Sequence, residues 1–290
     1  MPPIPRPRDS GFTTTTPVPL YWCSYGQPGG RRLFVLHGGP GADHQYLLPQ
    51  MLDLARDHEL ILYDQRGSGK SRTDDPTPIT WQTHVQDLGA VANEIGAHPL
   101  EVVGYSWGGL LAMLYATRPT ADGPTPASLA LIDPAPVSRG HRAEFEAEFA
   151  RRQQGEAIQR LRAELAESGL RETDPAAHRQ RAFELSVAGY FADPARAHDL
   201  TPFRVVGRVQ QSVWESLADF DLRPALERLA TPALVVHGRQ DPIPLASSQD
   251  VATALRARLV VLENCGHVPY VEQPQSLFDA VRQFLTENRP

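Results

Sequence analysis

The sequence predicts an α/β fold with a mainly parallel sheet. Short runs rich in Leu, Val and Ile alternate with longer helical patterns, which is the order of βαβ units. The chain has 290 residues, a length that suits one α/β domain carrying an insertion. A glycine-rich turn at residues 104–108 lies between an apolar run and a helical pattern, as a strand–turn–helix unit requires.

Each expected strand is a short apolar run. Residues 12–17 and 20–25, joined around Pro17 and Pro19, are expected to form an antiparallel pair that opens the chain. The other expected strands are residues 33–36, 60–63, 101–104, 129–132, 233–236 and 259–262. Amphipathic patterns predict helices at residues 81–95 and 277–285, packed on the sheet, and the glycine turn opens another at residues 110–116.

The middle of the chain has a different texture. From residue 137 to residue 222 no strand pattern appears, and residues 141–168 carry apolar side chains at helical spacing before a break at residues 170–175. We interpret residues 137–222 as a helical cap. It is inserted between a first core part, residues 1–136, and a second core part, residues 223–290.

Composition excludes several classes of protein. The chain is 41% hydrophobic and 21% charged with a net charge of −6, which indicates a soluble globular protein and argues against nucleic-acid binding. No apolar run approaches the roughly 18 residues that cross a bilayer. The first eight residues lack the apolar region of a signal peptide and resemble a short extended arm, so a cytoplasmic protein without a membrane partner is expected.

The cysteines and histidines indicate neither a disulfide framework nor a metal. Cys23 and Cys265 are expected to be buried and unpaired. The ten histidines show no metal-ligand spacing, so no metal and no cofactor are predicted. The oligomeric state stays open.

Gly104-Tyr105-Ser106-Trp107-Gly108 matches G-x-S-x-G. Because it follows a predicted strand and opens a predicted helix, it has the context of a nucleophile elbow, in which the serine sits on a strained turn. Gly104 and Gly108 are needed there because side chains would collide with the neighbouring strand and helix. Ser106 is therefore the predicted nucleophile, at a helix N-terminus that favours developing negative charge.

A serine hydroxyl needs a base, which in this chain order follows an acid. His267 lies directly after the last predicted strand and is the predicted base, whereas His237 ends a strand and is interpreted as a buried structural residue. Asp241, in a loop after the preceding strand, is the preferred acid because Gly238 and Pro242 expose it. Asp133, directly after another strand, is its competitor.

An oxyanion hole requires two backbone donors. One is expected from Trp107, the residue after the nucleophile, and the other from the loop at residues 37–41. Pro40 has no N–H to donate, so Gly39 is the predicted second donor.

Gly69-Lys70-Ser71 resembles the end of a phosphate-binding P-loop. That motif needs a glycine five positions before Gly69, where this chain has Asp64, so a nucleotide site is not predicted. Asp64 and Arg66 are instead expected to fix this loop, by hydrogen bonds and a local ion pair.

These motifs together resemble the α/β-hydrolase fold, and specifically the proline iminopeptidase group (serine peptidase family S33). The resemblance rests on residues 37–41, 64–71, 104–109 and 266–272 and covers the core on both sides of the cap. It implies a mostly parallel sheet flanked by helices, a helical cap over the active site, and release of N-terminal residues, often proline, from peptides.

The cap departs from the family pattern. Such aminopeptidases hold the free amine of the substrate with carboxylates, but Val187 and Pro242 occupy two positions where branches of the group carry Glu. Glu215, Glu184 and Asp219 are candidates to replace them, and Glu215 is the predicted substrate-binding residue. Each of the three is equally compatible with a solvated helix position.

The sequence thus predicts a serine hydrolase with Ser106, Asp241 and His267 as its catalytic residues. An aminopeptidase acting on short peptides is expected first, and a carboxylesterase or lactonase acting on small esters second. A third interpretation, from a different functional class, is a non-catalytic ligand receptor on the same fold.

Overall fold

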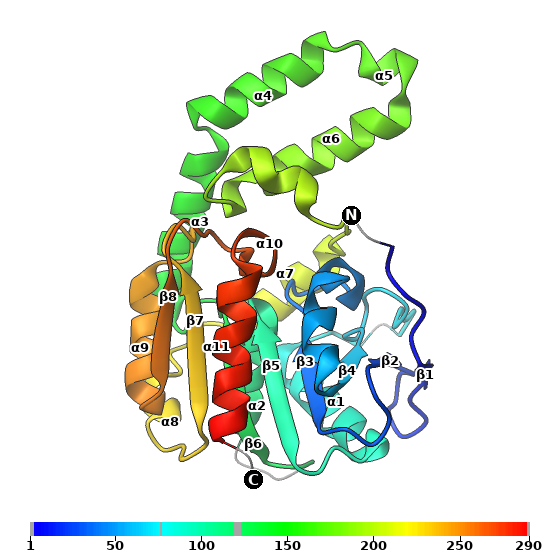
Figure 1. The fold of residues 1–290 in the computed structure, drawn as a ribbon, viewed down its shortest axis with the longest axis vertical. Helices are drawn as coiled ribbons and strands as arrows, with labels where there is room; N and C mark the ends of the chain where they lie inside the picture. Colours follow the sequence, from blue (N-terminus) through cyan, green and yellow to red (C-terminus); the bar gives the residue numbers. More distant parts are fainter. Residues whose placement is uncertain (1–2, 76, 119–122, 289–290) are drawn as a thin grey trace.

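The computed structural model describes residues 3–75, 77–118 and 123–288. The first two residues of the predicted N-terminal arm lie outside these ranges. In the described part of the chain, strands form one sheet in the order β1-β2-β4-β3-β5-β6-β7-β8 (Figure 1). The strands are β1 (Asp9–Phe12), β2 (Tyr21–Tyr25), β3 (Arg32–Leu36), β4 (Glu59–Tyr63), β5 (Leu100–Tyr105), β6 (Pro126–Ile132), β7 (Ala233–Gly238) and β8 (Arg258–Leu262).

The predicted fold class, a mostly parallel sheet flanked by helices, is confirmed. Strands β3 to β8 pair in parallel, whereas β1 with β2 and β2 with β4 pair antiparallel. Helices cover both faces, which is why the central strands are continuous apolar runs. Because parallel strands end at a common edge, the loops after β3, β5, β6, β7 and β8 meet there.

Alternate side chains of the central strands β3 to β7 enter separate cores. In β3, Phe34 and Leu36 belong to the core under α1 (Trp81–Ile95), α2 (Trp107–Ala116) and α9 (Leu245–Leu255). Leu33 and Val35 belong to the core under η2 (Gln50–Arg56) and α11 (Pro274–Glu287). The predicted helices at residues 81–95, 110–116 and 277–285 are thereby confirmed, two of them with longer bounds.

The first strand was predicted at the wrong place. Residues 13–17 are not in β1; instead the Thr13 N–H donates to Leu20 O at 2.9 Å, and the Thr14 N–H donates to the Glu94 carboxylate at 2.8 Å. Their threonines favour strands by composition, but here Thr14 and Thr15 bind a helix carboxylate. The true strand, Asp9–Phe12, is an exposed edge that pairs only with β2.

The middle segment, residues 137–222, is helical, as predicted, and consists of several separate helices. The stretch at residues 141–168 holds two helices, α3 (Arg139–Gln153) and α4 (Glu156–Glu167), because Gly155 interrupts them. The expected break at residues 170–175 contains a one-turn helix, α5 (Leu170–Thr173). The other helices follow: α6 (Pro175–Val187), η3 (Ala188–Tyr190), η4 (Pro194–Asp199) and α7 (Gly207–Ser216).

This helical segment projects from the sheet, and Figure 1 shows α4, α5 and α6 farthest from it. An isolated bridge between Ser138 and Asp221 joins the points at which the chain leaves and rejoins the core. Three short helices lie outside the helical segment: η1 (His44–Leu47), α8 (Arg223–Leu226) and α10 (Pro269–Glu272). The division at residues 136/137 and 222/223 stays a prediction, with the bridge within two residues of both boundaries.

Two composition-based predictions can be compared with the structure. Cys23 and Cys265 are both buried and free, as predicted. Among the helices in the described ranges, none combines the length and the apolar character needed to cross a membrane.

Replacing Phe34 by Ala tests the central core. Phe34 is 0% exposed between α-helical cover and the middle of the sheet, so Phe34→Ala is expected to lower the free energy of unfolding by about 3–5 kcal/mol in denaturant titration. Phe12→Ala is the matched control, since Phe12 is 52% exposed on the edge strand. Equal losses in the two variants would contradict this assignment of the core.

Candidate active site

Ser106 lies on a strained turn between β5 and α2. Its backbone has φ 53° and ψ −120°, in a region that residues other than glycine rarely adopt. The Ser106 N–H donates to Ile132 O on β6 at 2.9 Å, and the Ser106 carbonyl accepts from the Gly109 N–H at 2.9 Å. This strained turn, predicted from the motif, lifts the hydroxyl above the carboxyl edge of the sheet.

The glycines beside Ser106 are required by close backbone contacts. A Cβ on Gly108 would lie 2.2 Å from Leu36 O on β3, and a Cβ on Gly104 would lie 2.6 Å from Gly108 O. Both distances are far shorter than any allowed contact. The structure therefore bears out the steric reason given for these two glycines.

The structure brings Ser106, His267 and Asp241 into one hydrogen-bonded chain. His267 Nε2 lies 3.0 Å from Ser106 Oγ, and His267 Nδ1 lies 2.7 Å from Asp241 Oδ2. Asp241 Oδ1 accepts from the Ile243 N–H at 2.7 Å, which fixes the carboxylate. This geometry has the order that a serine nucleophile, a base and an acid require.

The backbone of His267 is held on both sides. Its N–H donates to Tyr190 O at 2.7 Å, and its carbonyl accepts from Tyr105 Oη at 2.7 Å. The ring packs against Tyr105 and Tyr190, with centroids at 5.2 and 5.1 Å. The helical segment, through Tyr190, thus helps to orient the imidazole.

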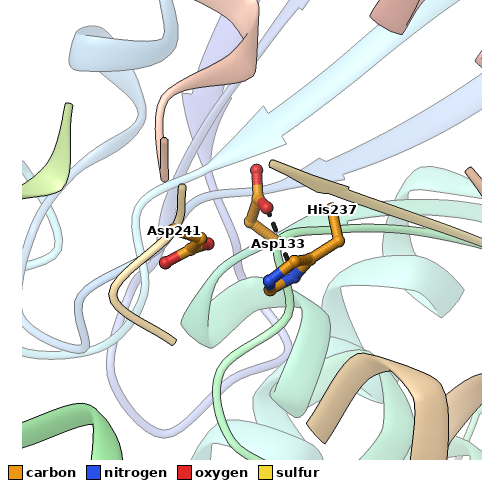
Figure 2. Close-up of side chains that lie close together, drawn as sticks. All are labelled: Asp133, His237 and Asp241. Atoms are coloured by element: carbon orange, nitrogen blue, oxygen red, sulfur yellow. Dashed lines mark ion pairs between the residues drawn. The ribbon is translucent and has the colours of Figure 1, made fainter. Parts of the chain in front are cut away.

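Asp133, the competing acid, makes a different contact. Its Oδ1 accepts from the Gly238 N–H at 2.8 Å, and His237 Nδ1 lies 3.5 Å from the same oxygen. His237 is buried, as predicted, and its Nδ1 lies 2.9 Å from Ser248 Oγ. Figure 2 shows Asp133 between His237 and Asp241.

These three side chains are close enough to resemble a metal site. One ligand-type atom of each of Asp133, His237 and Asp241 lies within 4.8 Å of the others. Both oxygens of Asp241, however, already accept hydrogen bonds from His267 and Ile243. These three side chains are therefore better suited to sharing a proton than to binding a metal ion.

Burial sets the charge states of the hydrogen-bonded chain. Desolvation lowers the pKa of His267 below its ordinary value, and the charge of Glu272 partly opposes this. Desolvation also raises the pKa of Asp241, and the hydrogen bond from the Ile243 N–H opposes that rise. A neutral imidazole, able to accept the Ser106 proton, is thus the stable form at neutral pH.

The predicted oxyanion donors both lie next to Ser106. Gly39 lines the cavity beside Ser106 and has φ 129°, a conformation that favours glycine. The neighbouring Gly38 N–H is already used by Tyr46 Oη at 2.7 Å. Trp107 opens α2 directly after Ser106, where a backbone N–H has no helical acceptor.

Two buried side chains that were not predicted, Gln65 and Tyr46, tie these loops together. Trp107 Nε1 donates to Gln65 Oε1 at 2.8 Å, and Gln65 Nε2 donates to His37 O at 2.9 Å. Tyr46, through Gly38, holds the same loop. The sequence signal for Gln65 was its place in the residue 64–71 motif, but nothing local indicated its partner.

Asp64 fixes its loop as predicted, though its ion-pair partner is different. It accepts from the Lys70 N–H at 2.8 Å and from His44 Nδ1 at 2.6 Å. Arg66 pairs instead with Asp87, at 2.5 Å. His44 also lies 3.4 Å from Cys23 Sγ, so the pair is anchored to β2.

Two cavities open on Ser106 and His267. One, of about 650 Å³, is lined by charged side chains of α3 and α7: Arg139, Arg142, Glu146 and Glu215. The other, of about 350 Å³, is mainly aromatic and includes Tyr46, Phe149, Phe183, Tyr190 and Phe203. A substrate can therefore present an apolar group on one side of Ser106 and a polar group on the other.

Of the three carboxylates considered from sequence, only Glu215 lines these two cavities. It accepts from Gln211 Nε2 at 2.7 Å. Glu184 forms an ion pair with Arg181 at 2.8 Å and faces neither cavity. Glu146, which was not predicted, lines the charged cavity but pairs with Arg142 at 2.8 Å.

Comparison with known proteins finds one matching family model and relatives that cover most of the chain. A family model described as "Alpha/beta hydrolase family" matches residues 33–280. A proline iminopeptidase of Heyndrickxia coagulans is 25% identical over 269 residues, covering 89% of this chain and 91% of that protein. A putative carbamate hydrolase, RutD, of Pseudomonas savastanoi pv. phaseolicola is 28% identical over 261 residues, covering 87% and 93%.

A solved structure is similar over almost the whole length. The proline iminopeptidase of Mycobacterium smegmatis has a TM-score of 0.67 and 26% identity, covering 97% of this chain and 98% of that chain.

Replacing Gly108 by Ala tests the packing that positions Ser106. The added Cβ would force α2 away from β3, so Gly108→Ala is expected to lower the free energy of unfolding by about 1–3 kcal/mol. Gly207→Ala is the control, because a Cβ on Gly207 meets nothing within 4 Å. Equal unfolding midpoints for Gly108→Ala and the parent chain would contradict the steric argument.

Proposed function

Because this chain belongs to the alpha/beta hydrolase family, we propose that it is a serine hydrolase acting through an acyl-enzyme intermediate on Ser106. The observation that carries this proposal is the continuous path from Ser106 Oγ through His267 to Asp241, with steps of 3.0 and 2.7 Å. The path opens on two cavities large enough for a small substrate.

In the first half of the reaction, Ser106 Oγ attacks the acyl carbon of the substrate. His267 Nε2 takes the hydroxyl proton as that bond forms, and Asp241 stabilises the resulting imidazolium through Nδ1–H. His267 then returns the proton to the leaving amine or alcohol, and the acyl group stays on Ser106. A water repeats these steps and releases the acid.

The negative charge of each tetrahedral intermediate falls on the former carbonyl oxygen. The Gly39 and Trp107 N–H groups are the donors for it, and Gln65 holds both loops at a fixed separation. Since these dipoles are fixed before the substrate arrives, little reorganisation is needed when the charge develops.

Replacing Ser106 by Ala tests the chemistry. Turnover of p-nitrophenyl acetate is expected to fall by about four orders of magnitude or more, because the covalent step is lost. A serine-directed fluorophosphonate should label the parent chain once and leave the variant unlabelled, as measured by mass spectrometry. Near-full activity of the variant would exclude this mechanism, and an inert, unlabelled parent chain would favour a ligand receptor.

For the substrate, we propose an aminopeptidase of proline iminopeptidase type that releases N-terminal residues from short peptides. Glu215, whose described partner is the neutral Gln211, supplies a carboxylate for the substrate ammonium in the charged cavity. The aromatic cavity suits an apolar ring or side chain. The similarity to proline iminopeptidases over most of the chain supports the same choice.

A second candidate is a carboxylesterase or lactonase acting on small esters. Glu146 is neutralised by Arg142, which also stacks on Trp214 at 4.1 Å, so the charged cavity has less free negative charge than its composition suggests. An uncharged ester would need only the aromatic cavity. The relative named as a carbamate hydrolase is consistent with acyl substrates that lack a free amine.

Replacing Glu215 by Gln distinguishes these candidates. For prolyl-β-naphthylamide the variant is expected to lose about tenfold in kcat/KM, mainly through KM, because the ammonium loses its counter-charge. Turnover of p-nitrophenyl acetate should be unchanged. Asp219→Asn is the matched control, since Asp219 is exposed and outside both cavities.

The contradicting outcomes are equally specific. If the parent chain hydrolyses short-chain p-nitrophenyl esters and none of a panel of aminoacyl-β-naphthylamides, the aminopeptidase proposal is wrong and the esterase candidate is favoured. If Glu215→Gln leaves an active aminopeptidase unchanged, Glu215 does not bind the amine.

A further inference from the structure

Asp133 and Asp241 are two carboxyl groups buried side by side at the edge of the sheet. Asp133 follows β6 and Asp241 follows β7, and an oxygen of each lies within 4.8 Å of the other (Figure 2). Asp133 is 0% exposed. Two carboxylate charges at this separation without solvent would repel each other strongly, so one of the two groups is expected to keep its proton.

The hydrogen bonds around the two groups indicate which one is protonated. Asp241 accepts from two donors, His267 Nδ1 and the Ile243 N–H, one on each oxygen. Asp133 accepts only from the Gly238 N–H, on Oδ1, and its buried Oδ2 has no hydrogen-bond partner among the described residues. A charge is better stabilised on Asp241, and an O–H on Asp133 Oδ2 would supply the missing hydrogen bond.

Among the residues that the structure describes, no neighbouring side chain offers Asp133 a positive charge. Burial lowers the pKa of His237 to about 3 and lowers the pKa of His267, so both rings are neutral near pH 7. Burial also raises the pKa values of the remaining acidic neighbours, which stay uncharged. These neighbours are Tyr105 on β5, Cys265 in the loop after β8 and Tyr270 on α10.

Charged groups lie only beyond this shell. Arg152 of α3 faces Asp241 and donates to Gln240 O, and Glu272 accepts from the Gly266 N–H at 2.7 Å. Neither is within hydrogen-bond contact of Asp133. The carboxyl pair is therefore isolated with a single negative charge to share.

We propose that Asp133 is a neutral carboxylic acid that donates a hydrogen bond to Asp241 and so acts as a positioning residue for the proposed acid of the site. The proton on Asp133 Oδ2 points to the carboxylate of Asp241, and Gly238 holds the other Asp133 oxygen in place. The inference rests on the proposed roles of Ser106, His267 and Asp241 only for its effect on turnover. The protonation of Asp133 itself is independent of any activity.

This arrangement has a consequence for the base. When His267 becomes an imidazolium during turnover, one negative charge faces it rather than two. A second charge would raise the pKa of His267 and keep it protonated, and so inactive as a base, up to a higher pH. A neutral Asp133 holds the Asp241 carboxylate while avoiding that penalty.

Infrared spectroscopy tests the charge state directly. The C=O stretch of a protonated carboxylic acid is expected in the parent chain near pH 7, to disappear in Asp133→Asn and to persist in Glu101→Gln. Glu101 is the matched control because it is equally buried, but it is paired with Arg31 at the opposite end of β5 from Ser106. Absence of the band from the parent chain, or its persistence in Asp133→Asn, would overturn the proposal.

The pH dependence of kcat/KM provides the second test. Asparagine can donate to Asp241 and accept from Gly238 like a protonated acid, so Asp133→Asn is expected to keep activity within about threefold, with the acidic limb unmoved. Asp133→Leu removes the donor and is expected to lower kcat by roughly tenfold to a hundredfold. If Asp133 were ionised, Asp133→Asn would remove a negative charge beside His267 and move the acidic limb to lower pH by about one unit.

The two readouts separate the possible failures. Should the chain prove not to be a serine hydrolase, the infrared result still decides whether Asp133 is protonated. Should Asp133→Leu fail to fold, Asp133→Asn still decides between a neutral and an ionised group. If the infrared band vanishes in Asp133→Asn but the acidic limb of its kcat/KM profile moves to lower pH, the positioning role is overturned.

Discussion

The close packing of α2 against β3 sets the position of the groups around Ser106. At Gly108 there is no room for a single carbon beyond the backbone, because Leu36 O occupies that space. The same contact brings the loop after β3, with Gly39, beside the start of α2, with Trp107. The proposed nucleophile and both proposed oxyanion donors are therefore placed by one steric constraint, and the strain at Ser106 is sustained by the packing around it.

Sequence reasoning works best where burial is complete. Strands β3 to β7 lie between two helical layers, so their side chains are apolar on both faces and each appears as an uninterrupted run. It fails at β1, which is mostly exposed and has no such run. There the threonines of residues 13–16 gave a misleading signal. The hydrogen bonds of Thr14 and Thr15 to Glu94, a residue of α1 far along the chain, cannot be seen in a local sequence pattern.

The residues of the candidate site likewise divide into those that the sequence predicts and those that it does not. The positions of Ser106, Asp241 and His267 follow from short motifs at strand ends, because a parallel sheet brings strand ends to one edge. The choice between Asp241 and Asp133 could not be made by such a rule, since both satisfy it. Gln65 and Tyr190 escaped prediction because their partners, Trp107 and His267, come from segments distant in sequence. Only the three-dimensional structure shows that Glu184 forms an ion pair with Arg181, whereas the partner of Glu215 among the described residues is the neutral Gln211.

Charge is distributed differently around His267 and in the cavity that is proposed to bind the substrate. The one carboxylate charge that Asp133 and Asp241 share lies next to His267, and the charges of Glu272 and Arg152 lie farther out. The low dielectric of the buried site therefore strengthens the interaction of that charge with the imidazolium when it forms. The ionic side chains of the charged cavity come from α3 and α7, where solvent weakens each pair. Sequence changes in the helical segment can therefore alter substrate preference without altering the acid–base groups. Tyr190 is the exception, because it contacts His267 directly and links that segment to the reacting groups.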